Sequence, residues 1–112
     1  MLPNEDIVRL RHMLEAAEQA VSFARGRERN DLHADQMLLF AVVRAIEIVG
    51  EAAGKVSAES RKQCPGLPWP SIIAMRNRLI HAYFDIDADR VWETVTDDLP
   101  PPIVELRAIL EA

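Results

Sequence analysis

The stretch MLLFAVVRAIEIVGEAAGKV, residues 37–56, decides the fold of this chain. Its apolar side chains recur at steps of three and four residues, so they share one face of a long helix. That face comprises Met37, Leu38, Ala41, Val42, Ala45, Ile48, Val49, Ala52 and Val56. With Asn30 or Asp31 as its start, this helix is expected to be the longest element. Gly50 and Gly54 each cost about 1 kcal/mol relative to alanine inside a helix, so they predict close approach by a neighbouring helix.

The residues before this stretch predict a second long helix. Asn4 is expected to cap its start, and Glu5 and Asp6 suit the positive end of the helix dipole. The segment Arg25-Gly26-Arg27 ends it. Between these limits the apolar residues again follow helical spacing, at Ile7, Leu10, Leu14, Ala17, Val21 and Ala24.

A short helix is expected to begin at Ser57 and to end near Cys64. The loop PGLPWP, residues 65–70, follows it, because prolines lack amide donors and restrict the residues before them. Trp69 in this loop is interpreted as a structural plug rather than a platform for stacking on a base, since an aromatic ring beside prolines commonly packs against helix ends.

A further helix is expected to run from about Ser71 to an interruption at residues 85–87. Asp87 can cap the next helix, and the prolines at 100–102 can open the last one, because proline suits the first helical turn. Short connections favour up-and-down packing of consecutive helices. We therefore predict an all-α, up-and-down bundle of five or six helices that forms a single domain over residues 1–112.

Length and composition set the broad class. A chain of 112 residues, 49% of them hydrophobic, can bury one core of its own. Cys64 is the only cysteine, so it cannot form an internal disulfide. No apolar run approaches the length of a membrane span, and the start MLPNEDIVRL lacks the features of a signal peptide. We expect a soluble protein in the reducing cytoplasm, with no membrane partner.

The net charge of −5 would argue against nucleic acid, since phosphate binding depends on lysine and arginine. The charge is uneven, however. Residues 85–112 hold eight of the 18 acids and two of the 13 basic residues, a net of −6, which leaves 11 basic and 10 acidic groups elsewhere. Local cationic sites therefore remain possible at Arg25, Arg27, Arg29, Arg76 and Arg78. The first three are equally well read as solvated surface side chains.

The segment MRNRLIHAYFD, residues 75–85, concentrates the groups that hold a phosphodiester and move a proton. Arginine binds phosphate oxygens with a bidentate fork, and histidine exchanges protons near neutral pH. On a continuous helix, Asn77 and His81 would stack four residues apart on a polar face. The opposite face would be apolar, with Ile72, Met75, Leu79 and Tyr83.

These groups suit cleavage of RNA by its own 2'-hydroxyl without a metal. His81 would take or donate a proton, and Arg76 would stabilise charge on the phosphate oxygens. Asn77 could orient the imidazole or bind phosphate, and Arg78 could contact the backbone of a longer substrate. Arg76 and His81 differ by about 140° around an ideal helix, so either the arginine reaches around or a symmetric dimer brings the pairs together. A surface arginine plus a capping histidine is the simpler alternative.

Other polar residues give weaker indications of a functional site. Glu47 and Glu51 lie four apart and are expected to pair with Arg76 or Arg44 rather than to bind a metal, because no histidine or third acid joins them. His12 and His33 have no recognisable partner in the sequence.

Several motifs occur in an order that resembles HepT toxins of the HEPN superfamily. Arg76, four residues, His81, Ala82 and Tyr83 match the R-x4-H-x-Y signature of that family. Other segments also resemble this family and follow the same order, so that the resemblance covers nearly the whole chain. These segments are Glu47 to Ala53, the Pro65 to Trp69 loop, Tyr83 to Asp87, Val91-Trp92 and Asp98-Leu99-Pro100.

The resemblance implies an all-helical, homodimeric ribonuclease toxin in which Arg76 and His81 match the catalytic pair. From their own chemistry, Asn77, Arg78 and Glu51 are expected to support this pair, and no cofactor is expected. It also implies a type VII toxin–antitoxin system, whose MntA-like nucleotidyltransferase antitoxin transfers AMP to the tyrosine of the signature, here Tyr83. RNA, including tRNA, would be the substrate. The alternative is a non-catalytic helical dimer that binds a nucleotidyltransferase partner or RNA.

Overall fold

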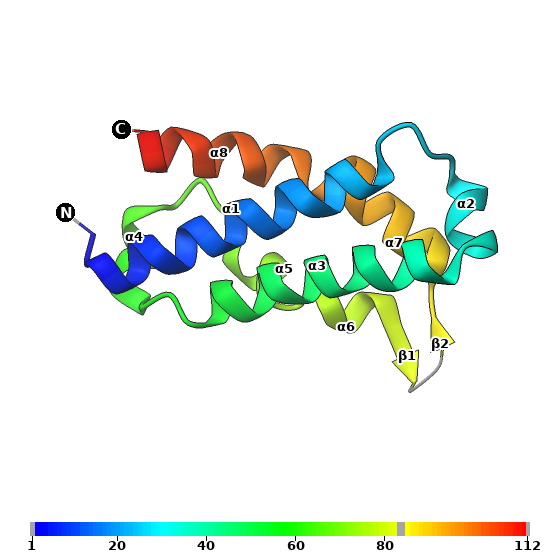
Figure 1. Cartoon of the computed structure of the whole chain (residues 1–112). Helices are drawn as coiled ribbons and strands as arrows, with labels where there is room; N and C mark the ends of the chain where they lie inside the picture. Colours follow the sequence, from blue (N-terminus) through cyan, green and yellow to red (C-terminus); the bar gives the residue numbers. More distant parts are fainter. Residues whose placement is uncertain (1, 83–84, 112) are drawn as a thin grey trace.

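The computed structural model describes residues 2–82 and 85–111, which form an elongated helical bundle of 45 × 28 × 18 Å. Two long antiparallel helices, α1 (Asn4–Ala24) and α3 (Gln36–Gly54), lie side by side along its length (Figure 1). The last helix, α8 (Pro100–Glu111), packs against α1, and the chain termini lie at the same end of the bundle. The predicted all-α fold is confirmed.

Shorter elements complete the bundle. A two-stranded antiparallel hairpin projects from the side of the bundle opposite α8 (Figure 1). In chain order the remaining elements are α2 (Arg29–Ala34), α4 (Ala58–Gln63), α5 (Trp69–Ile73), α6 (Met75–Leu79), β1 (Ile80–Ala82), β2 (Asp85–Ile86), α7 (Ala88–Glu93) and the π-helical turn η1 (Thr94–Asp98). The described residues thus contain eight α-helices rather than the five or six predicted.

The core lies mainly between α1 and α3. Small side chains such as Ala17 and Ala20 of α1, and Ala53 of α3, are fully buried and let the two helices approach closely. Larger side chains fill the remaining space, among them Leu10, Met13, Val42, Ile46 and Val49. No helix among the described residues combines the length and hydropathy needed to cross a membrane.

The prediction that the second helix is the longest element was wrong. It is divided at Asp35, whose side chain accepts a hydrogen bond from the Leu38 amide and caps α3. The cap leaves α3 with 19 residues, whereas α1 has 21. An aspartate that hydrogen-bonds an amide three residues later starts a new helix, which competes with continuation of the previous one.

The other helix ends agree only in part with the ends predicted from the sequence. The Ser57 hydroxyl accepts from the Ser60 amide and begins α4 as predicted, and Asp87 likewise caps α7 by accepting from the Arg90 amide. The prolines at 100–102 open α8. Asn4, however, is the first residue of α1 rather than its cap, and no side chain caps that end.

The predicted helix from Ser71 to the interruption at 85–87 was also wrong. It breaks at Ala74 into α5 and α6, and the helical backbone ends at Leu79. Ile80 is extended and pairs with Ile86 across the hairpin, while the Asp87 amide donates to the Leu79 carbonyl. Ile80 and Ile86 are β-branched, which favours extended backbone once a partner strand is available.

The two glycines of α3 differ in their surroundings. A Cβ at Gly50 would lie 3.4 Å from the Ile72 carbonyl oxygen and 3.5 Å from that of Ile73, so α5 approaches α3 at this point. The prediction of close helix approach is therefore confirmed at Gly50. At Gly54 nothing lies within 4 Å of such a Cβ, so the prediction was wrong there.

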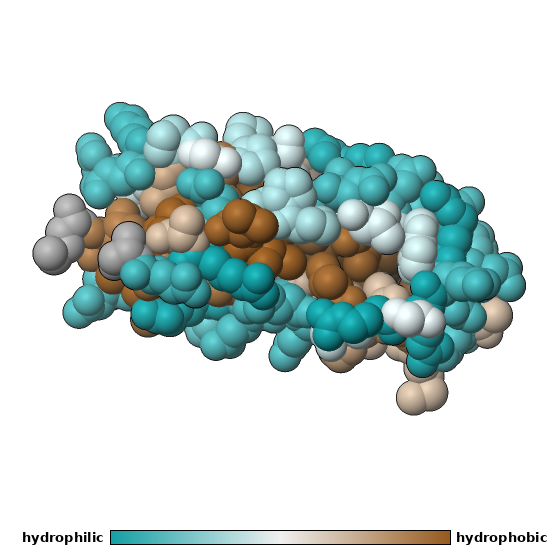
Figure 2. Space-filling view, turned by 90° about the horizontal axis from the view of Figure 1, so that it is seen from above, coloured by the Kyte–Doolittle hydropathy of each residue, from teal (hydrophilic) through white to brown (hydrophobic). Residues whose placement is uncertain are grey.

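The face formed by α1 and α8 carries a hydrophobic strip. Seen from above, brown side chains run along the middle of this face between hydrophilic margins (Figure 2). Both helices contribute partly buried hydrophobic residues that pack against the core, namely Leu14 and Val21 from α1 and Ile109 and Leu110 from α8.

Asp6 joins the start of α1 to α4. Its carboxylate accepts hydrogen bonds from the Ser57 amide, the Ser57 hydroxyl and the Ser60 hydroxyl. The Ser57 hydroxyl, followed by that of Ser60, holds the pKa of Asp6 below its ordinary value. The ionised carboxylate is therefore part of the folded structure.

Replacing Asp6 with asparagine is expected to destabilise the fold at neutral pH, because an amide cannot accept all three of these bonds. A lowered pKa contributes stability that is present above the ordinary aspartate pKa of about 3.9 and is lost as the pH falls through the folded-state value. The urea midpoints of wild type and Asp6→Asn, followed by circular dichroism, should therefore converge below about pH 4. A gap that stays constant from pH 7 to pH 3 would contradict this role.

Candidate active site

The helix α6 exposes three polar side chains to solvent, while its apolar side chains are buried in the core. Met75 and Leu79 are buried in the core, whereas Arg76, Asn77 and Arg78 are exposed. Because α6 also contacts α3, one of these side chains, Arg76, reaches the polar face of that helix.

An ion pair between α3 and α6 holds Arg76 in place. The Arg76 Nε–H donates to Glu47 Oε2 at 2.7 Å. The Glu47 side chain is 19% exposed and that of Arg76 is 50% exposed. Since this contact uses Nε, the terminal Nη1 and Nη2 groups can still donate to a phosphate oxygen.

A second arginine extends this group of charges along α3. Arg44 Nη1 lies 3.2 Å from Glu51 Oε1 and 4.0 Å from Glu47 Oε1. The prediction that the two glutamates pair with Arg76 or Arg44 is thus confirmed. Glu51, however, contacts Arg44, and Glu47 is the glutamate that contacts Arg76.

The sequence contained a signal that could have singled out Glu47. Gly50 marks the point where α5 approaches α3, and Glu47 lies one helical turn before it. The chain passes from α5 into α6 close to this point, so the glutamate nearer the start of α3 faces Arg76.

His81 lies in β1 and not on a helix. The predicted stacking of Asn77 and His81 on one helical face was therefore wrong, because the helix ends between them, at Leu79. Arg76 and His81 belong to consecutive elements, and the 140° separation of an ideal helix does not apply. Tyr83 lies outside the described residues.

Arg78 lines a different surface from Arg76. It borders a cavity of about 570 Å³ between α5, α6 and the C-terminal elements. Asp97, Asp98 and Glu105 line the same cavity. A phosphate there would face these carboxylates, so contact between Arg78 and an RNA backbone stays a prediction.

Trp69 is a structural residue, as predicted. Its ring is buried, its Nε1–H donates to the Cys64 carbonyl at 3.1 Å, and the Arg61 guanidinium lies 5.8 Å from the ring centroid. The Cys64 thiol is also buried, and burial followed by the charge of Glu105 raises its pKa. A thiol with a raised pKa is a poor nucleophile.

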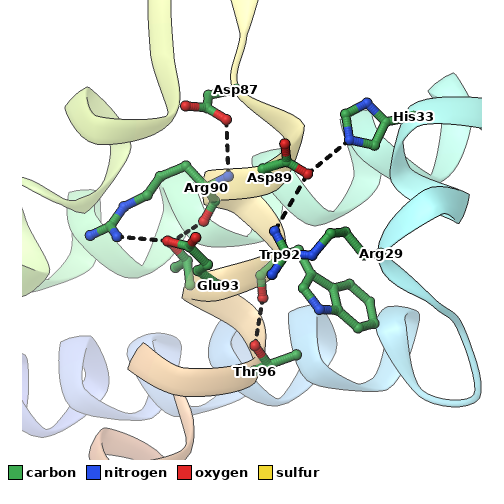
Figure 3. A network of polar contacts seen from close by, with 9 residues as sticks. Arg29, His33, Asp87, Asp89, Arg90, Trp92, Glu93 and Thr96 are labelled. Atoms are coloured by element: carbon green, nitrogen blue, oxygen red, sulfur yellow. Dashed lines mark hydrogen bonds and ion pairs between the residues drawn. The ribbon is translucent and has the colours of Figure 1, made fainter.

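His33 has a partner, contrary to the prediction. Its Nε2 lies 2.9 Å from Asp89 Oδ1, and Arg29 lies 3.4 Å from the same oxygen (Figure 3). The hydrogen bond from His33 is the main reason that the pKa of Asp89 is lowered. Because the two residues are 56 positions apart, the sequence alone could not reveal the contact.

The His33–Asp89 contact bears on the position of the hairpin. Asp89 belongs to α7, which follows β2, and His33 belongs to α2. Thr96 extends the ordered segment by donating to the Trp92 carbonyl (Figure 3). The strand that carries His81 thus pairs with β2, which leads into a helix tied to α2 by Asp89.

Replacing Glu47 with alanine is expected to lower the catalytic efficiency toward RNA by roughly fivefold, since an exposed ion pair contributes up to about 1 kcal/mol to positioning. Glu51→Ala is the matched control, because Glu51 lies one turn further on the same helix and contacts Arg44 instead. The measurement is kcat/KM on a labelled oligoribonucleotide, with circular dichroism to verify folding. Equal losses in both variants would show that Glu47 does not act through Arg76.

Comparisons with known proteins give a consistent result. The model of a family described as "Ribonuclease HepT-like" matches residues 13–109. A protein of Thermococcus cleftensis named "Probable ribonuclease HepT" is 38% identical over 91 residues, which cover 81% of this chain and 83% of that protein.

Two further relatives are named as candidate RNases. One, from Methanocaldococcus jannaschii, is 36% identical and covers 79% of this chain and 81% of its own length. Another, from Caldanaerobacter subterraneus, is 33% identical over 91% of both chains. No solved structure gives a significant match.

Proposed function

Because this chain belongs to the HepT-like ribonuclease family, we propose that it is a metal-independent endoribonuclease toxin whose active groups are Arg76 and His81. The observation that carries the proposal is the Glu47–Arg76 ion pair, which holds a half-exposed guanidinium on the element directly before the strand of His81. Glu47 keeps the cation in one place while leaving its outer amino groups for a substrate.

The reaction proceeds within the RNA itself. The 2'-hydroxyl loses its proton to a base, its oxygen attacks the adjacent phosphorus, and the bond from phosphorus to the 5'-oxygen breaks as that oxygen takes up a proton. The products are a 2',3'-cyclic phosphate and a free 5'-hydroxyl. His81 exchanges the proton, and Arg76 stabilises the charge on the non-bridging oxygens.

The exposed face of α3 supports a homodimer as the active form. Met37 is 83% exposed and Phe40 is 54% exposed, and Ile73 of α5 adds a third exposed apolar side chain. At 100° per residue, Met37 and Phe40 lie on the same side of α3 as Arg44 and Glu47. Pairing of two copies through this face would cover the apolar residues and bring two Arg76–His81 sets into one cleft.

Neutralisation by a nucleotidyltransferase antitoxin is the regulatory part of the proposal. The Tyr83 hydroxyl would attack the α-phosphorus of ATP and release pyrophosphate, which leaves AMP on the tyrosine. Tyr83 is two residues from His81 in the chain, so the added phosphate would repel RNA and occupy the cleft. The motif order that includes Tyr83 supports this assignment.

Incubation with an MntA-like transferase and ATP is expected to add AMP-sized mass to a peptide that contains Tyr83, and to stop RNA cleavage. Mass spectrometry measures the addition, and Tyr83→Phe is expected to remove it completely because phenylalanine has no hydroxyl. Label that persists at full yield in Tyr83→Phe would place the acceptor elsewhere.

Cleavage in EDTA tests the central claim. The purified protein is expected to cut a labelled oligoribonucleotide with chelator present and to leave 2',3'-cyclic phosphate ends. A wild-type protein that shifts RNA in a gel but leaves it uncut, also without antitoxin, would instead establish the non-catalytic binding function.

A further inference from the structure

We propose that the groove between α1 and α8 is a docking site for an acidic amphipathic helix of a partner protein. This α1–α8 groove comprises Ile7, Arg11, Leu14, Glu18 and Val21 of α1, Arg25 directly after α1, and Pro100, Ile103, Val104, Arg107 and Leu110 of α8. It is the hydrophobic strip of Figure 2, on the side of the bundle opposite the hairpin.

The α1 side of the groove has the spacing of a coiled-coil seam. Its six residues follow one another at alternating steps of four and three, the 3.5-residue period of helices that pack along their length. Within this series, Ile7, Leu14 and Val21 recur every seven residues, and charged residues lie between them. A separate set that includes Leu10, Met13 and Ala17 is buried. The helix thus has two apolar seams, one fully buried in the core and one only partly buried.

Hollows along the groove can receive side chains. One of about 230 Å³ lies between Ile7 and Arg11 of α1 and Ile109 and Leu110 of α8. Another of about 280 Å³ lies further along, where Val21 faces Ile103 and Val104. A third, of about 270 Å³, adjoins the second, because both are lined by Val21, Arg25 and Pro100. Concave sites in series suit the anchors of a helix better than a flat lipid surface.

The charges of the groove specify an acidic partner. The basic residues that line the first two hollows are Arg11, Arg25 and Arg107, and the acidic lining residue is Glu18. The groove therefore has a local excess of positive charge, although the chain has a net charge of −5. Arg107 pairs with Glu18, whereas Arg11 and Arg25 have no ion pair within residues 2–82 and 85–111. These two arginines lie fourteen residues apart in the chain, Arg11 within α1 and Arg25 directly after its end. Acids two heptads apart on a partner helix would meet both.

A second copy of this chain is a poor occupant. Two such grooves placed face to face would set positive charge against positive charge, which disfavours association. The apolar residues that support the homodimer, Met37 and Phe40, belong to α3 and not to this groove. The proposal is independent of ribonuclease activity, since docking here involves none of the residues assigned to cleavage.

The experiment uses two synthetic helical peptides of three heptads with leucines along one face. One carries glutamates two heptads apart beside the leucines, and the other carries lysines at the same positions. Fluorescence anisotropy with the wild-type protein at 50 mM salt is expected to show at least tenfold tighter binding of the glutamate peptide. At 500 mM salt the difference should shrink, because screening weakens charge pairing.

Charge reversal provides the control. Arg11→Glu with Arg25→Glu is expected to reverse the preference in favour of the lysine peptide. Lys55→Glu with Lys62→Glu makes the same change in net charge at exposed positions outside the groove and should keep the wild-type preference. Circular dichroism verifies that both double variants are folded.

Three outcomes would overturn the proposal. The first is equal binding of both peptides, or binding of neither. The second is that the wild-type protein binds vesicles containing anionic lipid in preference to the glutamate peptide, while the Arg11→Glu, Arg25→Glu double variant does not bind them. This result would identify the groove as a membrane-binding surface. The third is a dimer that Val104→Glu dissociates in sedimentation, which would show that a second copy covers the groove.

Discussion

Replacing His81 with alanine is expected to lower RNA cleavage by roughly 10²- to 10⁴-fold, the range associated with loss of a general acid–base group. Without the imidazole, neither the 2'-hydroxyl proton nor the 5'-oxygen has an efficient exchange partner. The rate is measured as single-turnover cleavage of a labelled oligoribonucleotide from pH 5 to 9. The wild-type rate should depend on pH because the imidazole must exchange a proton, and this dependence should disappear in the variant.

His12→Ala is the matched control for this experiment. His12 is an exposed histidine on α1, and no hydrogen bond or ion pair involves it among the described residues. Its removal should leave the rate and the pH profile unchanged. Cleavage by folded His81→Ala at the wild-type rate would refute the assigned role, whatever the family resemblance.

Mixing two inactive variants is expected to restore cleavage to about half the wild-type level if the cleft is shared between subunits. In a mixed dimer of Arg76→Ala and His81→Ala chains, one subunit keeps its histidine and the other keeps its arginine. A site built from both subunits then retains one intact pair. A site built within one subunit has none, and the loss of either group costs several orders of magnitude.

The mixed dimer is prepared by joint refolding of differently tagged chains and tandem affinity purification. Each variant refolded alone is the control and should stay inactive. Phe40→Glu introduced into both chains should abolish the rescue, since it places charge in the apolar face of α3 that supports pairing. Continued inactivity of a verified mixed dimer would show that Arg76 and His81 act within one chain.

The main helices could be predicted because local signals are enough for them. The periodic apolar residues from Met37 to Ala52 lie in α3, whereas Val56 follows its end, and Ser57 and Asp87 cap helices where their spacing suggested. Such features depend on residues three or four positions apart, which a helix brings together wherever it lies. The prolines at 100–102 likewise open α8, because a missing amide donor is tolerated only at a helix start.

The region that carries the chemistry was the least predictable. The segment after Leu79 has an apolar spacing compatible with a helix, yet its backbone is extended from Ile80. Ile80 pairs with Ile86, which lies just before α7 in the chain. Asp89 of α7 pairs with His33 and Arg29 of α2, more than fifty residues earlier in the chain. Local propensity cannot report such a contact.

The amino-acid sequence by itself determined that this protein is a helical bundle and that arginine, histidine and tyrosine occur together in one motif. It identified the core residues of α3 only in part, because Met37 of the predicted apolar face is 83% exposed whereas Ile46, outside that face, is fully buried. The tertiary structure decided that Glu47 rather than Glu51 holds Arg76, that His81 lies on a strand, and that Arg78 lines a separate cavity. The physical reason is distance along the chain. Periodicity and caps operate within a helical turn, whereas ion pairs between α3 and α6, and strand pairing next to α7, exist only after distant segments have packed.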